Sequence, residues 1–292
     1  MASSPATPSF SMFPRFLSFA YGVLIIFSSF CHCRRLQDSS PQGLTLDSVR
    51  DFLTREEDTI VFSLIERAKY PYDSPTYDPS YLHGKLSPVE LFVRETEAVQ
   101  AKAGRYQNPE EIPFFPNNLP LSLVPPYKFP QVLYPAAASV NVTKTIWNLY
   151  FNDLLLLFTT KGNDGNYALT AASDLVCLQA LSRRINYGRF VAEAKYRDAP
   201  QDYDPAIRAQ DKDALMKLLT SESQEEVVKR RVEKKAMVFG QDITLGKNYT
   251  CDSNGNRTNY KVDPSVLYRL YGDWVIPLTK LVEAEYLLHR LD

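Results

Sequence analysis

The sequence predicts an all-α fold, a single-domain helical bundle of about 250 residues. Apolar residues recur at helical spacing along most of the chain, and no stretch alternates polar and apolar residues long enough to predict a strand. Only 11 of the 292 residues are glycine, whereas sheets and tight turns normally need more. No internal repeat and no linker divides the chain beyond residue 44.

The first 33 residues are typical of a secretory signal peptide. Residues 1–15 contain Arg15 and no acid, an apolar run covers 16–30, and Cys31 and Cys33 are small residues in front of a cleavage site. Residues 34–43 are then a linker and residues 44–292 the folded domain. This interpretation predicts a protein of the secretory pathway or the extracellular space. A signal anchor, a plastid transit peptide or a mispredicted first exon stay open, with a cytoplasmic or plastid location as the alternative.

Two glycosylation sequons become relevant under the same interpretation. Asn248 and Asn256 each begin an Asn-x-Thr motif inside the polar stretch 246–259, which has the composition of an exposed loop. They are candidate glycan sites if the chain enters the secretory pathway.

The helices are predicted from apolar periodicity and from their end signals. Asp47 is a candidate cap for the first helix, and Ser221 and Ser223 each begin a possible capping box. The proline-rich stretch 104–136 is predicted as extended chain that packs through its aromatic residues. The predicted helices cover residues 46–69, 88–102, 143–160, 170–197, 205–220, 221–239, a segment opened by Asp263-Pro264, and 277–291.

Charge and motifs exclude several classes of protein. The net charge of −1 gives no electrostatic case for binding nucleic acid. With three His, four Cys and no HExxH or CxxC motif, a zinc or haem site is not predicted. The glycine-rich loops that hold nucleotides are absent as well.

Arg184 and Lys195 are the first candidate site residues. They lie eleven residues apart, which is close to three helical turns, so both point from one helix face with about 16 Å between their backbones. Two long cations on one face can bracket a small dianion, although a solvated basic face is the commoner cause of such spacing. Arg183 is turned by about 100° and is the weaker candidate.

The last helix offers Thr279 and Glu283, which lie one above the other at i and i+4. Glu285 is rotated by about 200° from Glu283 and is expected to face elsewhere. An ordinary solvent-facing helix surface is again the simpler explanation of this pattern alone.

Long motifs give the chain a resemblance to a known family. It resembles the eukaryotic, all-helical chorismate mutases, and most closely the unregulated, cytosolic-type plant enzymes. The matching stretches tile most of 44–292, and they are residues 46–77, 104–116, 174–203, 206–220 and 271–292. The resemblance implies a homodimeric helical bundle that rearranges chorismate to prephenate in phenylalanine and tyrosine biosynthesis, with no cofactor and no metal.

The resemblance also implies roles for six residues. The arginines would hold the two carboxylates of chorismate, and the lysine would donate to the ether oxygen. One glutamate would take the ring hydroxyl, and the final-helix pair would lie beside the ether oxygen. In chain order the six are Arg50, Arg184, Lys195, Glu225, Thr279 and Glu283. The chemistry agrees, because an intramolecular rearrangement needs conformer selection and charge stabilisation but no nucleophile.

Regulated members of the family bind tryptophan and tyrosine at a dimer interface. Arg105 matches an effector-contacting arginine, but Ala168 and Leu169 replace the family's Gly-Ser pair. A bulky leucine there should interfere with an amino-acid ligand, so we expect an enzyme insensitive to both. Two alternatives stay open: a secreted helical glycoprotein without turnover, and a secreted effector that consumes chorismate in another compartment.

Overall fold

In the computed structural model, residues 43–82, 84–241 and 260–292 are described, and all of them belong to one compact unit. Their helical elements, from the first to the last, are α2 (Leu46–Arg67), α3 (Ser74–Tyr77), η1 (Pro79–Leu82), α4 (Pro88–Lys102), η2 (Arg105–Gln107), η3 (Pro116–Asn118), η4 (Pro135–Ala137), α5 (Thr143–Leu149), η5 (Tyr150–Leu154), α6 (Leu155–Phe158), α7 (Tyr167–Asn186), α8 (Gly188–Asp198), α9 (Pro200–Arg208), α10 (Lys212–Leu219), α11 (Glu222–Phe239), α12 (Pro264–Leu270), η6 (Tyr271–Val275) and α13 (Ile276–Leu288).

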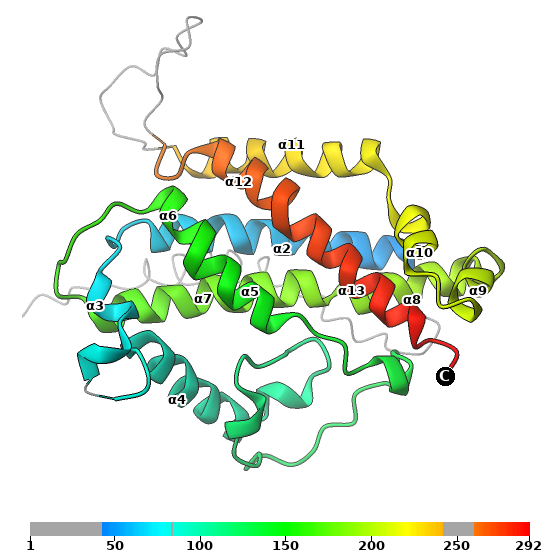
Figure 1. The fold of residues 1–292 in the computed structure, drawn as a ribbon, viewed down its shortest axis with the longest axis horizontal. Helices are drawn as coiled ribbons and strands as arrows, with labels where there is room; N and C mark the ends of the chain where they lie inside the picture. Colours follow the sequence, from blue (N-terminus) through cyan, green and yellow to red (C-terminus); the bar gives the residue numbers. More distant parts are fainter. Residues whose placement is uncertain (1–42, 83, 242–259) are drawn as a thin grey trace, which may run out of the picture. The chain divides into compact units, whose positions relative to one another are not determined.

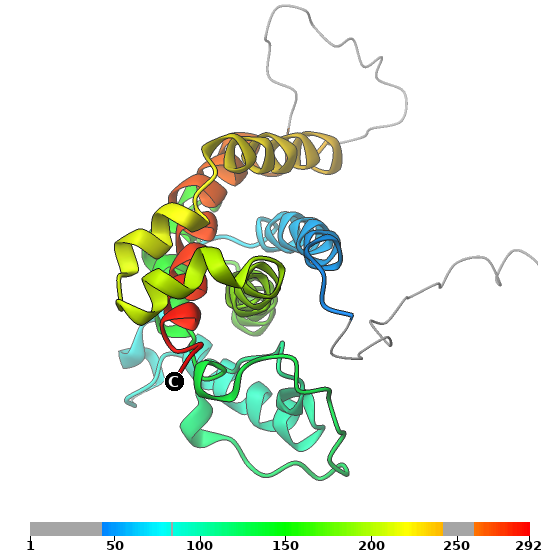
Figure 2. The same cartoon turned by 90° about the vertical axis from the view of Figure 1, so that its right-hand side faces the viewer.

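The described residues form no strand, only two isolated bridges, so the predicted all-α class is confirmed. Helices α2, α7 and α11 run side by side along the long axis, and α12 to α13 crosses them (Figure 1). Figure 2 looks nearly along α2, α7 and α11 and shows them stacked. None of the described helices combines the length and apolarity needed to cross a membrane.

The core divides into two clusters of buried side chains. The larger joins α2, α4, α7, α11 and α12 around residues such as Ile60, Leu64 and Leu178, none of which has exposed surface. The smaller lies where the start of α2 meets α8, α9, α10 and the end of α13, and it contains Tyr187, Leu215 and Leu287. The second cluster fixes the helix pair α8 and α13 that carries the candidate site.

Local sequence explains where several helices begin. Helix α4 has the predicted bounds, because the Ser87 hydroxyl accepts from the backbone of Glu90 and Pro88 occupies the first turn. Helix α2 begins as predicted but is capped by Thr45, in a reciprocal pair with Ser48, instead of Asp47. At α11 the predicted capping boxes do not form, since Ser221 is the N-cap without a side-chain hydrogen bond to the backbone.

Other boundaries differ from the prediction for identifiable reasons. The helix predicted over 205–220 is two helices, because Gln210 has a φ of 52° and Asp211 then caps α10 through the backbone of Ala214. The helix predicted over 170–197 is divided at Tyr187, whose backbone nevertheless stays in the right-handed helical region. The last two predicted helices are one continuous segment, joined by the π-helical turn η6.

The predicted targeting segment 1–33 and the sequons at Asn248 and Asn256 lie outside the described residues.

Candidate active site

Four of the six predicted residues meet between α7–α8 and α13. Arg184, near the end of α7, donates from Nη1 to the Thr279 hydroxyl at 3.2 Å. Eleven residues further on, Lys195 Nζ lies 2.7 Å from a carboxylate oxygen of Glu283. The two faces predicted from helical spacing therefore face each other, and the contacts form two rungs between neighbouring helices.

The surroundings of the Arg184 side chain suit an anionic ligand. Its side chain is buried, and the Thr279 hydroxyl that it contacts is itself anchored by donating to the carbonyl of Val275 at 2.6 Å. The Nε atom of Arg184 is buried and has no hydrogen-bond partner among the described residues. Because a buried guanidinium donor without an acceptor is costly, this geometry suits a carboxylate ligand.

The contact between Lys195 and Glu283 concerns the protonation of the Glu283 carboxyl. Burial raises the pKa of the Glu283 carboxyl, and the opposing charges of Lys195 and Arg184 do not cancel that effect. Glu283 is 4% exposed, whereas the Lys195 side chain reaches the surface at 27%. The buried carboxyl is thereby biased toward the protonated form, in which it can donate a hydrogen bond.

A glycine that the sequence analysis left without a role permits this close helix pair. A Cβ at Gly188 would lie 2.8 Å from the Thr279 carbonyl oxygen and 3.2 Å from the Val282 side chain. Any larger residue would push α8 away from α13. Its only signal in the sequence was a lone glycine inside a long helical pattern.

Glu225 lies at the edge of this site. It is in the first turn of α11, and its carboxylate binds Lys280 Nζ at 2.8 Å, next along the chain from Thr279. The sequence analysis did not identify Lys280, which also donates to the Thr220 hydroxyl.

Arg50 is not among the residues brought together. Its side chain is 69% exposed and binds Asp47 one turn earlier in α2, at 3.0 Å. It does line a groove of about 420 Å³ together with Ala194, the neighbour of Lys195, and with Arg197 and Asp198.

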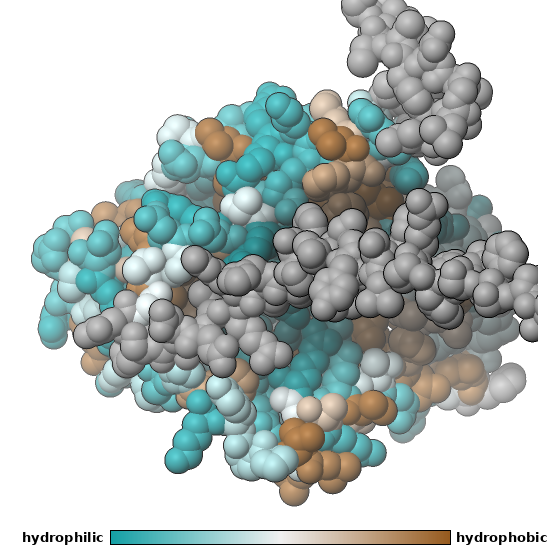
Figure 3. Space-filling view, turned by 180° about the vertical axis from the view of Figure 1, so that it is seen from behind, coloured by the Kyte–Doolittle hydropathy of each residue, from teal (hydrophilic) through white to brown (hydrophobic). Residues whose placement is uncertain are grey.

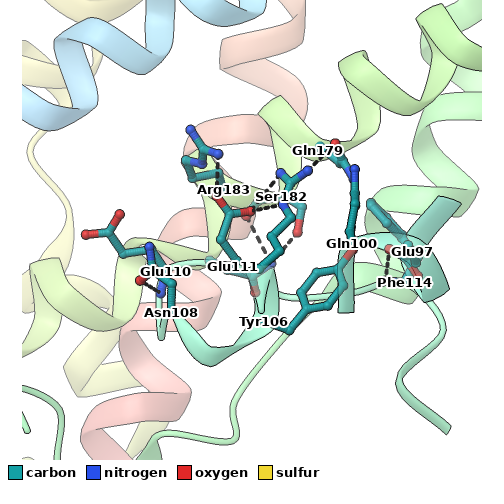
Figure 4. A network of polar contacts seen from close by, with 12 residues as sticks. Glu97, Gln100, Tyr106, Asn108, Glu110, Glu111, Phe114, Gln179, Ser182 and Arg183 are labelled. Carbon is teal, nitrogen blue, oxygen red and sulfur yellow. Dashed lines mark hydrogen bonds and ion pairs between the residues drawn. The ribbon is translucent and has the colours of Figure 1, made fainter. Parts of the chain in front are cut away.

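The predicted effector residues lie in two separate places. Arg105 donates to Glu111 at 2.8 and 3.0 Å and to Gln179 at 2.8 Å, and Glu111 also binds Arg183. Figure 4 shows Glu111 and Gln179 in this network. Ala168 and Leu169 are exposed in the first turn of α7, ten residues before Gln179, which is about 15 Å along the helix. One chain does not bring Arg105 and Leu169 together.

Two neighbouring side chains have their partners outside the candidate site. Glu285 turns away from the site to Lys212, as expected, at 2.5 Å. Asn186, two residues after Arg184, is buried and accepts a hydrogen bond from the backbone of Val142 at 3.2 Å. The described residues hold no group of three or more His, Cys, Asp or Glu side chains placed to bind a metal ion.

Comparison with known proteins identifies relatives over most of the chain. The family model for chorismate mutase type II matches residues 166–284. Chorismate mutase 2 of Arabidopsis thaliana is 60% identical, over 85% of this chain and 94% of the relative. Cytosolic chorismate mutase 2 of Zea mays is 54% identical, over 85% and 97%. Chloroplastic chorismate mutase 1 of Arabidopsis thaliana is 46% identical, over 94% and 82%.

Solved structures agree with these relatives. AtCM1 with phenylalanine in an allosteric site gives a TM-score of 0.76 at 48% identity, covering 86% of this chain and 98% of that one. Aro7p chorismate mutase from Candida albicans, in complex with L-Trp, gives 0.79 at 33% identity, covering 86% and 94%.

The predicted secretory or extracellular location is wrong, because the relatives are cytosolic or chloroplastic enzymes. Glycans at Asn248 and Asn256 were expected only for a chain in the secretory pathway, so this correction removes the reason to expect them. Identity at this level covers nearly the whole length of these relatives and agrees with the all-helical fold. The chain belongs to the chorismate mutase family.

Proposed function

We propose that residues 44–292 form a chorismate mutase domain that converts chorismate to prephenate through Arg50, Arg184, Lys195, Glu225, Thr279 and Glu283. The reaction is an isomerisation: the ether C–O bond breaks while a C–C bond forms in the same molecule, and nothing enters or leaves. The observation that carries the proposal is the pair of rungs between α7–α8 and α13, Arg184–Thr279 and Lys195–Glu283.

Each side chain suits one part of the substrate. Arg184 offers a buried planar fork to a carboxylate, and Thr279 keeps that fork in place. Lys195 supplies positive charge where negative charge grows on the ether oxygen, and protonated Glu283 donates to the same oxygen. A millionfold acceleration requires about 8 kcal/mol of transition-state stabilisation, which several charge-assisted contacts can supply.

Two residues must change partner for this assignment to hold. Arg50 would leave Asp47 and reach through the groove beside Ala194 to the second carboxylate. Glu225 would accept from the ring hydroxyl while retaining Lys280 as its counterion. The exposed Arg50–Asp47 contact is an ordinary surface ion pair, so exchanging it for substrate costs little.

The test is a chorismate-consumption assay on the full chain, with the product identified. Disappearance of chorismate with appearance of prephenate is expected. A folded protein without turnover would overturn the proposal and favour a non-catalytic member of the family.

Replacing Glu283 by glutamine is expected to remove the decline of activity at high pH. Because the carboxyl pKa is raised and only the protonated form donates, wild-type kcat/KM should fall as pH rises through that pKa. The amide of glutamine donates at every pH, so the variant's profile should be flat there. The measurement is kcat/KM against pH for both proteins, and parallel profiles would contradict the role of Glu283.

A homodimer is the second part of the proposal. Arg105 and Leu169 lie too far apart in one chain to hold one amino acid, whereas a second copy could bring them together. Exposed apolar side chains on α4 and α7, including Val99 at 64% and Val176 at 53%, support an interface there. Figure 3 shows further hydrophobic side chains at the lower edge, where Figure 1 places the segment between α4 and α5. Light scattering is expected to give twice the 33.3 kDa chain mass.

Tryptophan and tyrosine are expected to leave the activity unchanged. Leu169 is 54% exposed at the position where regulated relatives have a small residue, so its side chain occupies space that an amino-acid ligand would need. Initial rates with and without each amino acid at millimolar concentration check this. A clear change with either one would contradict it, and phenylalanine belongs in the same assay because AtCM1 binds it.

A further inference from the structure

A buried carboxylate next to the candidate site has no assigned role. Glu193 lies on α8, two residues before Lys195, and its side chain is 1% exposed. It accepts from Tyr286 Oη at 2.6 Å, from Arg197 Nε at 2.6 Å, and from Arg290 at 2.7 and 3.3 Å. We call Glu193, Arg197, Tyr286 and Arg290 the Glu193 cluster.

The cluster joins the same two helices as the catalytic rungs. Tyr286 is on α13, three residues after Glu283, so Glu193–Tyr286 is a third rung, beside Lys195–Glu283. Both oxygens of the Glu193 carboxylate are used, one by Arg197 and one by Tyr286, and Arg290 reaches both. Because this buried carboxylate accepts only from two arginines and from a short tyrosine hydrogen bond, it connects the two helices rigidly.

Two further segments are tied to the cluster. The Tyr286 hydroxyl accepts from the backbone of Tyr134 at 2.8 Å, and Arg197 donates to the carbonyl of Val132 at 2.6 Å. The Arg290 guanidinium lies over the Tyr134 ring at 4.7 Å, and the Tyr134 hydroxyl donates to the carbonyl of Asp292. The C-terminal residues and segment 132–134, which precedes η4, thus hold the end of α13 against α8.

We propose that Glu193 is a positioning residue for the mutase reaction, which sets the spacing of α8 and α13 and thereby the meeting of Lys195 with Glu283. The inference rests on the proposed function, since it concerns how that site is held. Glu193 touches no substrate. Its contribution is geometric: a displacement of about 1 Å at a reacting centre costs as much as a hundredfold in rate.

The test compares Glu193→Gln with Glu97→Gln. Glu97 is equally buried and accepts from the backbones of Phe114 and Phe115, but it lies on α4, away from the site. Both changes should lower the thermal unfolding temperature, because each leaves buried donors poorly matched. Only Glu193→Gln should lower kcat, by about tenfold or more, with a smaller change in KM. Equal kcat in the two variants would reduce Glu193 to a structural role and overturn the proposal.

Tyr286→Phe is a milder second test, which is used if Glu193→Gln does not fold. It removes one hydroxyl, and a lower kcat is expected, whereas an unchanged kcat would contradict the proposal. In a Glu283→Gln background the same change should have little further effect on kcat, because both act through one contact. Full additivity would mean that the Glu193 cluster acts elsewhere.

A crystal structure of Tyr286→Phe separates this inference from the proposed function. The distance from Lys195 Nζ to the Glu283 carboxylate should be longer than in a crystal structure of the wild type, for which about the present 2.7 Å is expected. If wild-type protein fails to convert chorismate, the function is wrong, yet this distance still decides whether the cluster sets the spacing. An unchanged distance would overturn the inference even in an active enzyme.

Discussion

Replacing Arg184 by alanine is expected to lower kcat/KM for chorismate by about a thousandfold. Arg184 is 5% exposed and its Nε has no acceptor among the described residues, so this group is largely desolvated before substrate arrives. Losing one member of a buried, charged contact costs about 2–5 kcal/mol, and about 4 kcal/mol corresponds to a thousandfold. The measurement is steady-state turnover with prephenate identified as the product.

Arg183→Ala is the matched control, because it removes the same side chain one position away. Arg183 points to Glu111 and to Glu56, 3.6 Å away, and not to Thr279. We expect this variant to lose stability, since the buried Glu56 loses its ion pair and Glu111 keeps only Arg105, while the folded protein keeps its turnover. If both variants keep their turnover, Arg184 does not hold the substrate and the site lies elsewhere.

Replacing Lys195 by methionine is expected to lower kcat by about a hundredfold to a thousandfold, with a smaller change in KM. Methionine keeps most of the length of the side chain and removes the charge. The loss falls on kcat because the ether oxygen gains negative charge mainly in the transition state, and one such donor is worth about that factor. Glu283 would also lose the nearest charge that opposes protonation, so its pKa should rise further.

Lys212→Met provides a comparison, because Lys212 on α10 also pairs with a glutamate of α13. Lys212 binds Glu285 on α13 at 2.5 Å, and its side chain is 43% exposed. An exposed ion pair contributes about 1 kcal/mol or less, so kcat should stay within about twofold of wild type. A fall in kcat as large as that of Lys195→Met would show that any lysine paired with a glutamate of α13 matters, and would remove the case for Lys195 at the ether oxygen.

The comparison of prediction and structure is clearest in the helix ends. Ser87 and Pro88 act within one turn, so the start of α4 could be predicted from neighbours in the chain. The break at Gln210 could not, because glutamine carries no preference for a positive φ, and only the packing of α9 and α10 around Leu215 and Ile207 requires it there. The unused capping box at Ser221 shows the same limit of local signals.

The sequence by itself determined the all-helical class and the placing of Arg184 with Lys195, and Thr279 with Glu283, on common faces. Those features depend on periodicity, which is a property of one helix. Only the tertiary structure decided which faces meet and that Gly188 lets the two helices approach. It also decided that burial raises the pKa of Glu283 by more than the charge of Lys195 lowers it. The tertiary structure also pairs Arg50 with Asp47 and does not bring it to the other predicted site residues. Burial and charge at a point are sums over segments distant in the chain, so they exist only once those segments are packed together.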